Sequence, residues 1–173
     1  MNLLHDIDPG TKEAMNVIVE IPKGSKNKYE IDKQTGIIKL DRVMHSAQDY
    51  PFDYGFVPQT LWDDGDALDV VLFTTHPLAP GILVEARPIG IMHMVDGGEP
   101  DEKVIAVAIS DPRYAHVKDL PDANQHVLKE IAHFFATYKQ IQNKEVRVGG
   151  FENRAAAEAA FERGRALYQA KAA

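Results

Sequence analysis

Short stretches rich in apolar side chains, some alternating with polar ones, recur along the first 110 residues. Runs of this length that are rich in β-branched residues and bounded by Gly, Pro or Asp are typical of β-strands. The pattern predicts strands at 14–22, 29–32, 37–43, 70–74, 82–95 and 103–109, and a later one at 145–151. The second and third of these flank Gly36 and predict a hairpin. Residues 50–62 contain two prolines and a glycine, which favours irregular or edge structure there.

The spacing of apolar residues changes after residue 120. From residue 122 to residue 138 apolar side chains recur at helical spacing, and Asn124 is a suitable N-cap. Residues 153–172 are rich in Ala, Glu and Arg, which predicts a second helix, and we assign it packing alone. Short strands followed by two helices predict an α+β, mainly β fold, a small closed barrel with two flanking C-terminal helices. We expect residues 1–173 to form a single domain.

Composition narrows the classes of function. Apolar residues make up 45% of the chain and charged residues 26%, as in ordinary globular proteins. The lack of cysteine excludes disulfides, thiolate zinc sites and cysteine nucleophiles. No apolar run is long enough for a membrane span and the N-terminus does not resemble a signal peptide, so we expect a cytoplasmic protein without membrane contact. A formal net charge of −7 argues against a nucleic-acid partner.

The strongest candidate for chemistry is the run Asp64-Gly65-Asp66-Ala67-Leu68-Asp69, in which three carboxylates lie within six residues. Mg²⁺ prefers oxygen ligands and is held by a few carboxylates together with water and phosphate oxygens. The apolar run after Asp69 would hold that carboxylate on a rigid strand. The alternative is a solvated acidic turn. A second acidic loop, 96–101, is by itself most simply a polar hairpin tip, but two such clusters at strand ends of one barrel can converge and bind more than one metal.

Cationic and phenolic side chains form a third group of candidates, each of which also has an ordinary structural explanation. They come from the segments 28–30, 41–42, 50–54 and 138–139. Arg binds phosphate in bidentate fashion, Lys supplies a point charge and Tyr donates a neutral hydrogen bond. Glu20 stands apart because it interrupts an apolar strand. A buried Glu20 needs a partner, whereas the alternation of the strand also allows it to face solvent.

Taken together, these segments resemble the family I soluble inorganic pyrophosphatases of the bacterial type. The runs VIVEIP, KYEID, DRVM, YPFDYGF, DGDALDV, MVDGGEPDEK and HFFATYK follow one another in the order and spacing of that family, from about Val17 to Glu152. The resemblance implies a five-stranded barrel of the OB type, a homohexamer and several Mg²⁺ ions per active site. Two positions depart from the family pattern: Ala67 replaces a usual proline, and Gly97 replaces a frequent acidic residue.

The resemblance also implies residue roles. The metal-binding carboxylates would be Asp64, Asp69 and Asp101 as direct ligands, Asp96 for the metals that arrive with substrate, and Glu20 through water. The catalytic set would be Asp66 as general base for the attacking water, with Lys28, Arg42 and Tyr54. Lys28, Arg42, Tyr54, Lys103, Tyr138 and Lys139 would bind the phosphates, and Glu30 and Tyr50 would line the pocket.

The expected reaction is metal-dependent hydrolysis of pyrophosphate to two phosphates, with in-line attack by a metal-activated water. Three alternatives stay open from the residues. One is an OB-type module that binds a nucleotide or oligonucleotide without catalysis, against which the net charge speaks. Another is a metal-dependent hydrolase of nucleoside polyphosphates. The third is an inactive structural subunit, which the complete set of matched carboxylates disfavours.

Overall fold

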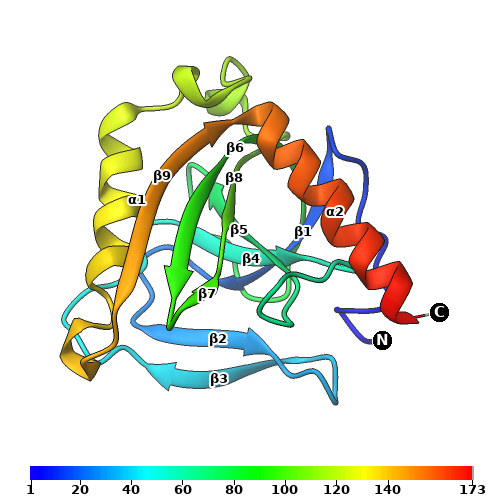
Figure 1. The fold of residues 1–173 in the computed structure, drawn as a ribbon. Coiled ribbons are helices and arrows are strands. Elements are labelled where there is room, and N and C mark those ends of the chain that lie inside the picture. Colours follow the sequence, from blue (N-terminus) through cyan, green and yellow to red (C-terminus); the bar gives the residue numbers. More distant parts are fainter. Residues whose placement is uncertain (173) are drawn as a thin grey trace.

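The computed structural model describes residues 1–172, and its secondary structure is mainly β with two helices in the C-terminal part (Figure 1). The strands are β1 (Met15–Ile21), β2 (Asn27–Ile31), β3 (Ile38–Val43), β4 (Asp53–Val57), β5 (Leu68–Phe73), β6 (Leu83–Asp96), β7 (Glu99–Pro100), β8 (Lys103–Ala108) and β9 (Val146–Asn153). The helices are α1 (Gln125–Thr137) and α2 (Arg154–Ala172), with short 3-10 turns η1 (Pro112–Tyr114), η2 (Leu120–Asp122) and η3 (Gln140–Gln142). The expected strands and both expected helices are therefore present, with small shifts at their ends.

Five strands pair in a ring. Strand β1 pairs antiparallel with β4, β4 with β5, and β5 runs parallel to β8. Strand β8 pairs antiparallel with β6, and β6 pairs with β1, so each of the five has two neighbours within the set. The long strand β6 also pairs with β7 and β9. Strands β2 and β3 form a separate two-stranded sheet, which runs below the others in Figure 1.

The prediction for residues 50–62 was wrong in its centre. Residues 53–57 form β4, which is buried throughout and paired on both sides, so it is not an edge strand. Pro51 and Pro58 lie outside the strand and leave its hydrogen bonds intact. Gly55 is required inside it because a Cβ atom there would lie 2.0 Å from the carbonyl oxygen of Ile18 on β1. The glycine therefore marks a close approach of two strands, and not a break.

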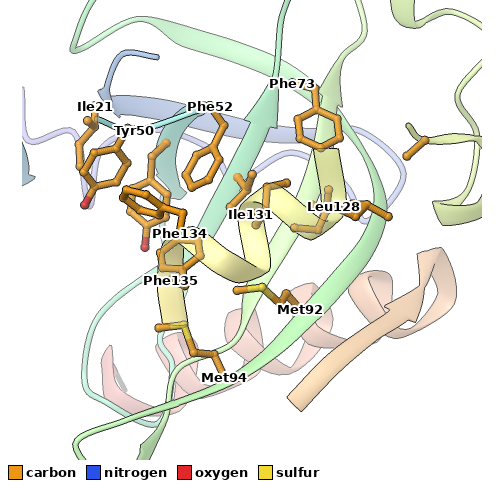
Figure 2. Close-up of a cluster of buried hydrophobic side chains, with 14 of the residues drawn as sticks. Ile21, Tyr50, Phe52, Phe73, Met92, Met94, Leu128, Ile131, Phe134 and Phe135 are labelled. Carbon is orange, nitrogen blue, oxygen red and sulfur yellow. The ribbon is translucent and has the colours of Figure 1, made fainter. Parts of the chain in front are cut away.

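The ring of strands is buried on both of its faces. Val70 and Leu72 of β5 belong to an apolar cluster shared with Phe161 of α2, whereas Val71 and Phe73 belong to a cluster shared with α1. Burial on both faces explains why β5 and β8 read as continuous apolar runs rather than as alternating ones. Figure 2 shows the second of these clusters, in which Tyr50, Phe52, Phe134 and Phe135 gather at α1.

The ends of α1 bring two site residues into place. Asn124 caps its N-terminus as expected and accepts hydrogen bonds from the backbone N–H groups of His126 and Val127. Tyr138 is the C-cap of the helix, and Lys139 follows at the start of η3. The side chains of these two residues are therefore carried by the end of a packed helix. Within residues 1–172, no helix has both the length and the apolar character that crossing a membrane requires.

Candidate active site

All of the candidate residues lie on the wall of one cavity of about 920 Å³. They come from most of the strands, from the turn before β5 and from the end of α1. The wall contains the fourteen expected side chains Glu20, Lys28, Glu30, Arg42, Tyr50, Tyr54, Asp64, Asp66, Asp69, Asp96, Asp101, Lys103, Tyr138 and Lys139. Residues separated by more than 100 positions in the sequence thus face a common space.

The acidic turn before β5 is held by local hydrogen bonds. Gly65 adopts a φ of +83°, and its N–H donates to the carbonyl of Trp62. The Asp66 N–H donates to Asp64 Oδ1 at 3.0 Å. Ala67 packs against a small apolar cluster formed by Leu4, Ile18 and Phe56. The turn is thus ordered by its own bonds, with alanine at the position of the family's usual proline.

Asp69 and Asp101 share one buried lysine. Asp69 on β5 is the register partner of Lys103 on the parallel strand β8. The Lys103 ammonium lies 2.6 Å from Asp69 Oδ2 and also donates to Asp101. Burial would lower the pKa of Lys103, but the two carboxylates outweigh it and raise that pKa. Lys103 therefore stays charged although its side chain is only 3% exposed.

The second acidic loop is a tight hairpin. Asp96 at the end of β6 pairs with Glu99, and Gly97 and Gly98 between them have φ values of +59° and +89°. Two successive residues with positive φ are typical of a two-residue hairpin turn, which explains glycine at position 97. The Asp96 carboxylate accepts a hydrogen bond from Lys139. The predicted convergence of the two acidic clusters on one space is thereby realised in the structure.

Glu20 is on the buried side of β1, at 5% exposure, so the solvent-facing alternative was wrong. Its Oε1 accepts a hydrogen bond of 2.6 Å from the Ile31 N–H on β2. Burial, together with the negative charge of Asp69, raises the pKa of Glu20 to about 8. Burial and then the charges of Asp69 and Asp101 raise the pKa of Asp64 to about 6. These carboxylates repel one another, as expected for a site that cations would neutralise.

Three tyrosines stay neutral on the cavity wall. Tyr50, Tyr54 and Tyr138 are nearly fully buried. Burial is the main reason that the pKa of each is raised above its ordinary value, and nearby charge adds to this through Asp69 for Tyr54 and Asp96 for Tyr138. A phenol that keeps its proton donates a hydrogen bond without bringing charge, which suits recognition of a phosphate oxygen.

The hairpin of β2 and β3 brings a cationic pair to the cavity. Lys28 and Arg42 are register partners. The Asp41 carboxylate accepts from Lys28 Nζ at 3.0 Å and from Arg42 Nη1 at 3.1 Å, and Lys28 also donates to Glu30 at 3.1 Å. Burial would lower the pKa of Lys28, but Asp41 and Glu30 raise it overall. Asp41 therefore orients the two cations, a contribution that was not assigned from the sequence.

Asp66 differs from the other acidic candidates. Its side chain is 53% exposed and forms an ion pair with Lys33. Lys33 lies in the turn between β2 and β3, so this contact ties the hairpin to the acidic turn. Lys33 was not singled out from the sequence, because a lysine in a polar turn is usually just solvated. Its contact with Asp66 becomes visible only in the folded structure.

The last helix also takes part in the cavity wall. It was expected to serve packing alone, but Tyr168 and Lys171 line the cavity together with His5 from the N-terminal segment. His5 Nδ1 and the Tyr168 hydroxyl are 2.7 Å apart. The functional assignment of α2 was therefore incomplete, since its periodic Ala-rich pattern contains no signal for these contacts.

The donor set suits hard cations. The five proposed metal ligands, Glu20, Asp64, Asp69, Asp96 and Asp101, offer only carboxylate oxygens to one space, which is the chemistry that Mg²⁺ selects. The pKa values of three of them, Glu20, Asp64 and Asp101, are raised, in each case mainly by burial. Within residues 1–172, however, no three acidic or histidine side chains stand close enough to form a ready ligand cluster. Lysine ammonium groups at Asp69, Asp96 and Asp101 supply positive charge there instead. The residues therefore fit bound Mg²⁺ in kind, provided that these lysines turn toward other anions.

We expect replacement of Lys103 by methionine to destabilise the metal-free protein by about 3 kcal/mol, because it leaves two partly buried carboxylates without their counter-charge. Urea unfolding in the presence of a chelator measures this, and added Mg²⁺ should restore part of the loss. Lys39→Met is the matched control, because Lys39 pairs with Asp32 on the exposed hairpin and its loss should change the midpoint little. An unchanged midpoint in Lys103→Met would contradict the central role of this ammonium.

Carboxylates suited to hard cations, beside cationic and phenolic donors suited to phosphate, are the features of a protein that binds a phosphorylated substrate together with metal ions. Comparison with known proteins makes the class specific. The Pyrophosphatase family profile, described as inorganic pyrophosphatase, matches residues 17–169. The chain belongs to the inorganic pyrophosphatase family, whose members depend on metal ions.

Individual relatives agree with the family profile. The chain is 50% identical to soluble inorganic pyrophosphatase 1 of Arabidopsis thaliana over 85% of its own length and 70% of the relative's. It is 46% identical to the inorganic pyrophosphatase of Picrophilus torridus, over 88% and 87% of the two chains. The crystal structure of the inorganic pyrophosphatase from Thermus thermophilus superposes with a TM-score of 0.93 at 44% identity, covering 98% of this chain and 99% of the other.

Proposed function

We propose that the chain hydrolyses inorganic pyrophosphate to two phosphates, with several Mg²⁺ ions and in-line attack by an activated water. The observation that carries the proposal is the gathering of all fourteen candidate residues on one cavity wall. Family membership supports the same reaction. The reading as a binding module without catalysis is not favoured, because the relatives are named as enzymes.

Asp64, Asp69 and Asp101 would hold the resident cations, Asp96 those that arrive with substrate, and Glu20 would act through water. Bound Mg²⁺ would supply Lewis-acid activation of the attacking water and neutralise phosphate charge. The protein's part is to present carboxylate oxygens from rigid strands. Asp69 lies within β5 and Lys103 beside it on β8, so the pairing of the two strands fixes the backbone positions of both residues.

The cationic and phenolic side chains would bind the two phosphates. They are Lys28, Arg42, Tyr54, Lys103, Tyr138 and Lys139, and Glu30 and Tyr50 shape the pocket around them. Lys28 and Arg42 come from the hairpin, whereas Lys103 and Tyr54 come from the ring of strands. Pyrophosphate would thus lie between two structural units, with positive charge on both. Positioning and electrostatics of this kind supply most of the rate in phosphoryl transfer.

Asp66 would accept the proton of the attacking water. Its position on the cavity wall, at 53% exposure, leaves it accessible to a solvent molecule. A general base must come within hydrogen-bond reach of the proton that it takes. The position of Asp66 is set by the hydrogen bonds of the turn, such as the one from its N–H to Asp64 Oδ1. No covalent enzyme intermediate is needed.

The proposed reaction is tested by phosphate release from pyrophosphate with the purified protein, in Mg²⁺ and without it. Two phosphates per pyrophosphate, released only with Mg²⁺, are the expected result. If no phosphate is released under either condition and the protein binds single-stranded nucleic acid in a mobility-shift assay, the result would favour a binding module without catalysis over an enzyme.

We also propose that the ring of strands is a closed five-stranded barrel of the OB type and that residues 1–173 form one domain. The pairing of β6 with β1 supports closure.

We further propose a cytoplasmic homohexamer without nucleic-acid or membrane partners. Large apolar side chains at the surface, including Ile37, Leu40, Val43 and Ile141, support self-association. Sedimentation velocity would contradict the hexamer if the 19.2 kDa chain sediments as a monomer.

Arg42→Ala is expected to raise the KM for pyrophosphate and to lower kcat/KM by about 10- to 100-fold, since a hydrogen bond to a charged group is worth about 1.5–3 kcal/mol. Arg42→Lys keeps the positive charge but loses the forked geometry of the guanidinium group, so its kcat/KM should lie between those of the wild type and of Arg42→Ala. Steady-state phosphate release measures both variants. A wild-type kcat/KM in Arg42→Ala would remove Arg42 from the site.

A further inference from the structure

Trp62 lies at the base of the acidic turn and joins it to the second acidic segment. Its backbone N–H donates to the Asp66 carbonyl at 2.7 Å, and its carbonyl accepts from Gly65 N–H at 3.0 Å. Its buried indole Nε1 donates to Glu102 Oε2 at 2.7 Å. Glu102 directly follows Asp101 in the chain. A single side-chain hydrogen bond thus connects the segment of Asp64 to the segment of Asp101.

Helix α2 supports this connection from the outside. The Arg163 guanidinium lies 4.4 Å from the centre of the Trp62 ring and 2.5 Å from Asp63 Oδ1. The neighbouring backbone is also joined, because the Leu61 N–H donates to the Gly164 carbonyl at 2.9 Å. Arg163 therefore contacts both the tryptophan and the residue just before Asp64. The acidic turn is held against α2 at this point.

Glu102 is itself held from a second direction. Its Oε1 lies 3.7 Å from His93 Nδ1 on β6, and its side chain is 19% exposed. Trp62, Glu102 and Arg163 do not belong to the cavity wall. Trp62 and Glu102 are, however, adjacent in sequence to residues that do, and Arg163 contacts Trp62 and Asp63 directly before Asp64. Any influence on the reaction must pass through the placement of those neighbours.

We propose that Trp62, Glu102 and Arg163 are positioning residues that fix Asp64 and Asp101 relative to each other for cation binding. This inference rests on the proposed function. The two carboxylates belong to separate segments and carry like charge, so the Trp62–Glu102 hydrogen bond opposes their repulsion, in addition to the bridge that Lys103 forms between Asp69 and Asp101. Partners that orient ligands from behind typically change metal affinity or activity by 10- to 100-fold when they are removed.

The test is the Mg²⁺ dependence of Trp62→Phe, which keeps an aromatic ring under Arg163 but removes the indole donor. We expect the half-saturating Mg²⁺ concentration for phosphate release to rise about 10-fold, while kcat at saturating Mg²⁺ stays within about 2-fold of the wild type. Calorimetric titration with Mg²⁺ alone, without substrate, should show the same weakening. If the substitution only loosened the packing, it would lower thermal stability, but it would not weaken Mg²⁺ binding while leaving kcat unchanged.

Two variants of Glu102 provide the comparison. Glu102→Gln keeps an acceptor oxygen and should stay near the wild type, whereas Glu102→Ala should reproduce Trp62→Phe. The double variant of Trp62→Phe with Glu102→Ala should be no weaker than either single variant, because both remove the same bond. If one of the single variants folds poorly, the other single variant still tests the same hydrogen bond.

Arg165→Ala is the matched control for Arg163→Ala. Arg165 stacks on Phe161 of the same helix, with 5.6 Å between its guanidinium carbon and the ring centre. We expect weaker Mg²⁺ binding for Arg163→Ala and wild-type binding for Arg165→Ala. Wild-type Mg²⁺ affinity in both Trp62→Phe and Glu102→Ala would overturn the inference alone. A wild-type protein that releases no phosphate with Mg²⁺ would overturn the proposed function and this inference with it.

Discussion

Asp66→Asn is expected to lower kcat for pyrophosphate hydrolysis by about 10²- to 10⁴-fold, the range that a positioned general base contributes. The amide has nearly the same shape as the carboxylate but does not accept the proton of the attacking water. Fold and Mg²⁺ binding should persist, because the turn is held by backbone bonds and by Asp64 Oδ1, none of which needs the Asp66 carboxylate. Steady-state phosphate release and calorimetry with Mg²⁺ separate the two effects.

Glu99→Gln is the control for this substitution. Glu99 is an exposed carboxylate of β7, in the neighbouring acidic hairpin but outside the cavity wall. Its amide variant removes one negative charge near the site and should keep wild-type kcat. Full turnover in Asp66→Asn would refute the general-base role. Equal losses in both variants would attribute the effect to overall charge instead of proton transfer.

Local pattern was enough to predict most of the fold, because strands and helices impose different periods on the sequence. Asn124 shows this most directly, since its type and place before an apolar helical run predicted the cap that the structure contains. Segment 53–57 shows the limit. Glycine and flanking prolines usually break strands, and only the approach of Ile18 to Gly55 reveals why this strand requires its glycine.

Family resemblance predicted a set of side chains that the structure places on one cavity wall, but it did not predict their mutual contacts. Lys103 meets Asp69 because β5 and β8 run parallel in a register that no local pattern encodes. Lys33 meets Asp66 only because the hairpin folds over the acidic turn. Arg163 meets Asp63 across 100 positions of sequence. Long-range contacts of this kind follow from the packing of the whole chain.

These contacts also explain how a chain with a net charge of −7 can accept a dense polyanion. The four cationic side chains proposed to bind phosphate, Lys28, Arg42, Lys103 and Lys139, are each engaged by a carboxylate, as Lys28 is by Asp41 and Lys139 by Asp96. Cations bound to Asp69, Asp96 and Asp101 would release Lys103 and Lys139 toward phosphate. Charge from the protein and charge from the metal would then act on the substrate together.

Removal of divalent cations is expected to have the largest effect of all. Cation stabilisation of the transition state is worth several kcal/mol, so phosphate release in excess chelator should fall by at least about 10³-fold. The same removal should lower stability, because a ligand present at about 100 times its Kd stabilises the folded state by about 2.7 kcal/mol. For a chain of this size that corresponds to a fall in Tm of roughly 5–10 °C. Calorimetric scans with Mg²⁺ and with chelator measure the difference.

The pH dependence of Mg²⁺ binding follows from the same carboxylates. In the metal-free protein the pKa of Asp64 is raised to about 6 and that of Glu20 to about 8, mainly by burial. Each carboxyl group must lose its proton before it can interact with a cation, so Mg²⁺ affinity should weaken as the pH falls from 8 to below 6, with release of protons on binding.

Asp69→Asn should lose most of the Mg²⁺-dependent rise in Tm. If chelator leaves both Tm and phosphate release unchanged, the carboxylates serve the fold and not a metal-dependent reaction.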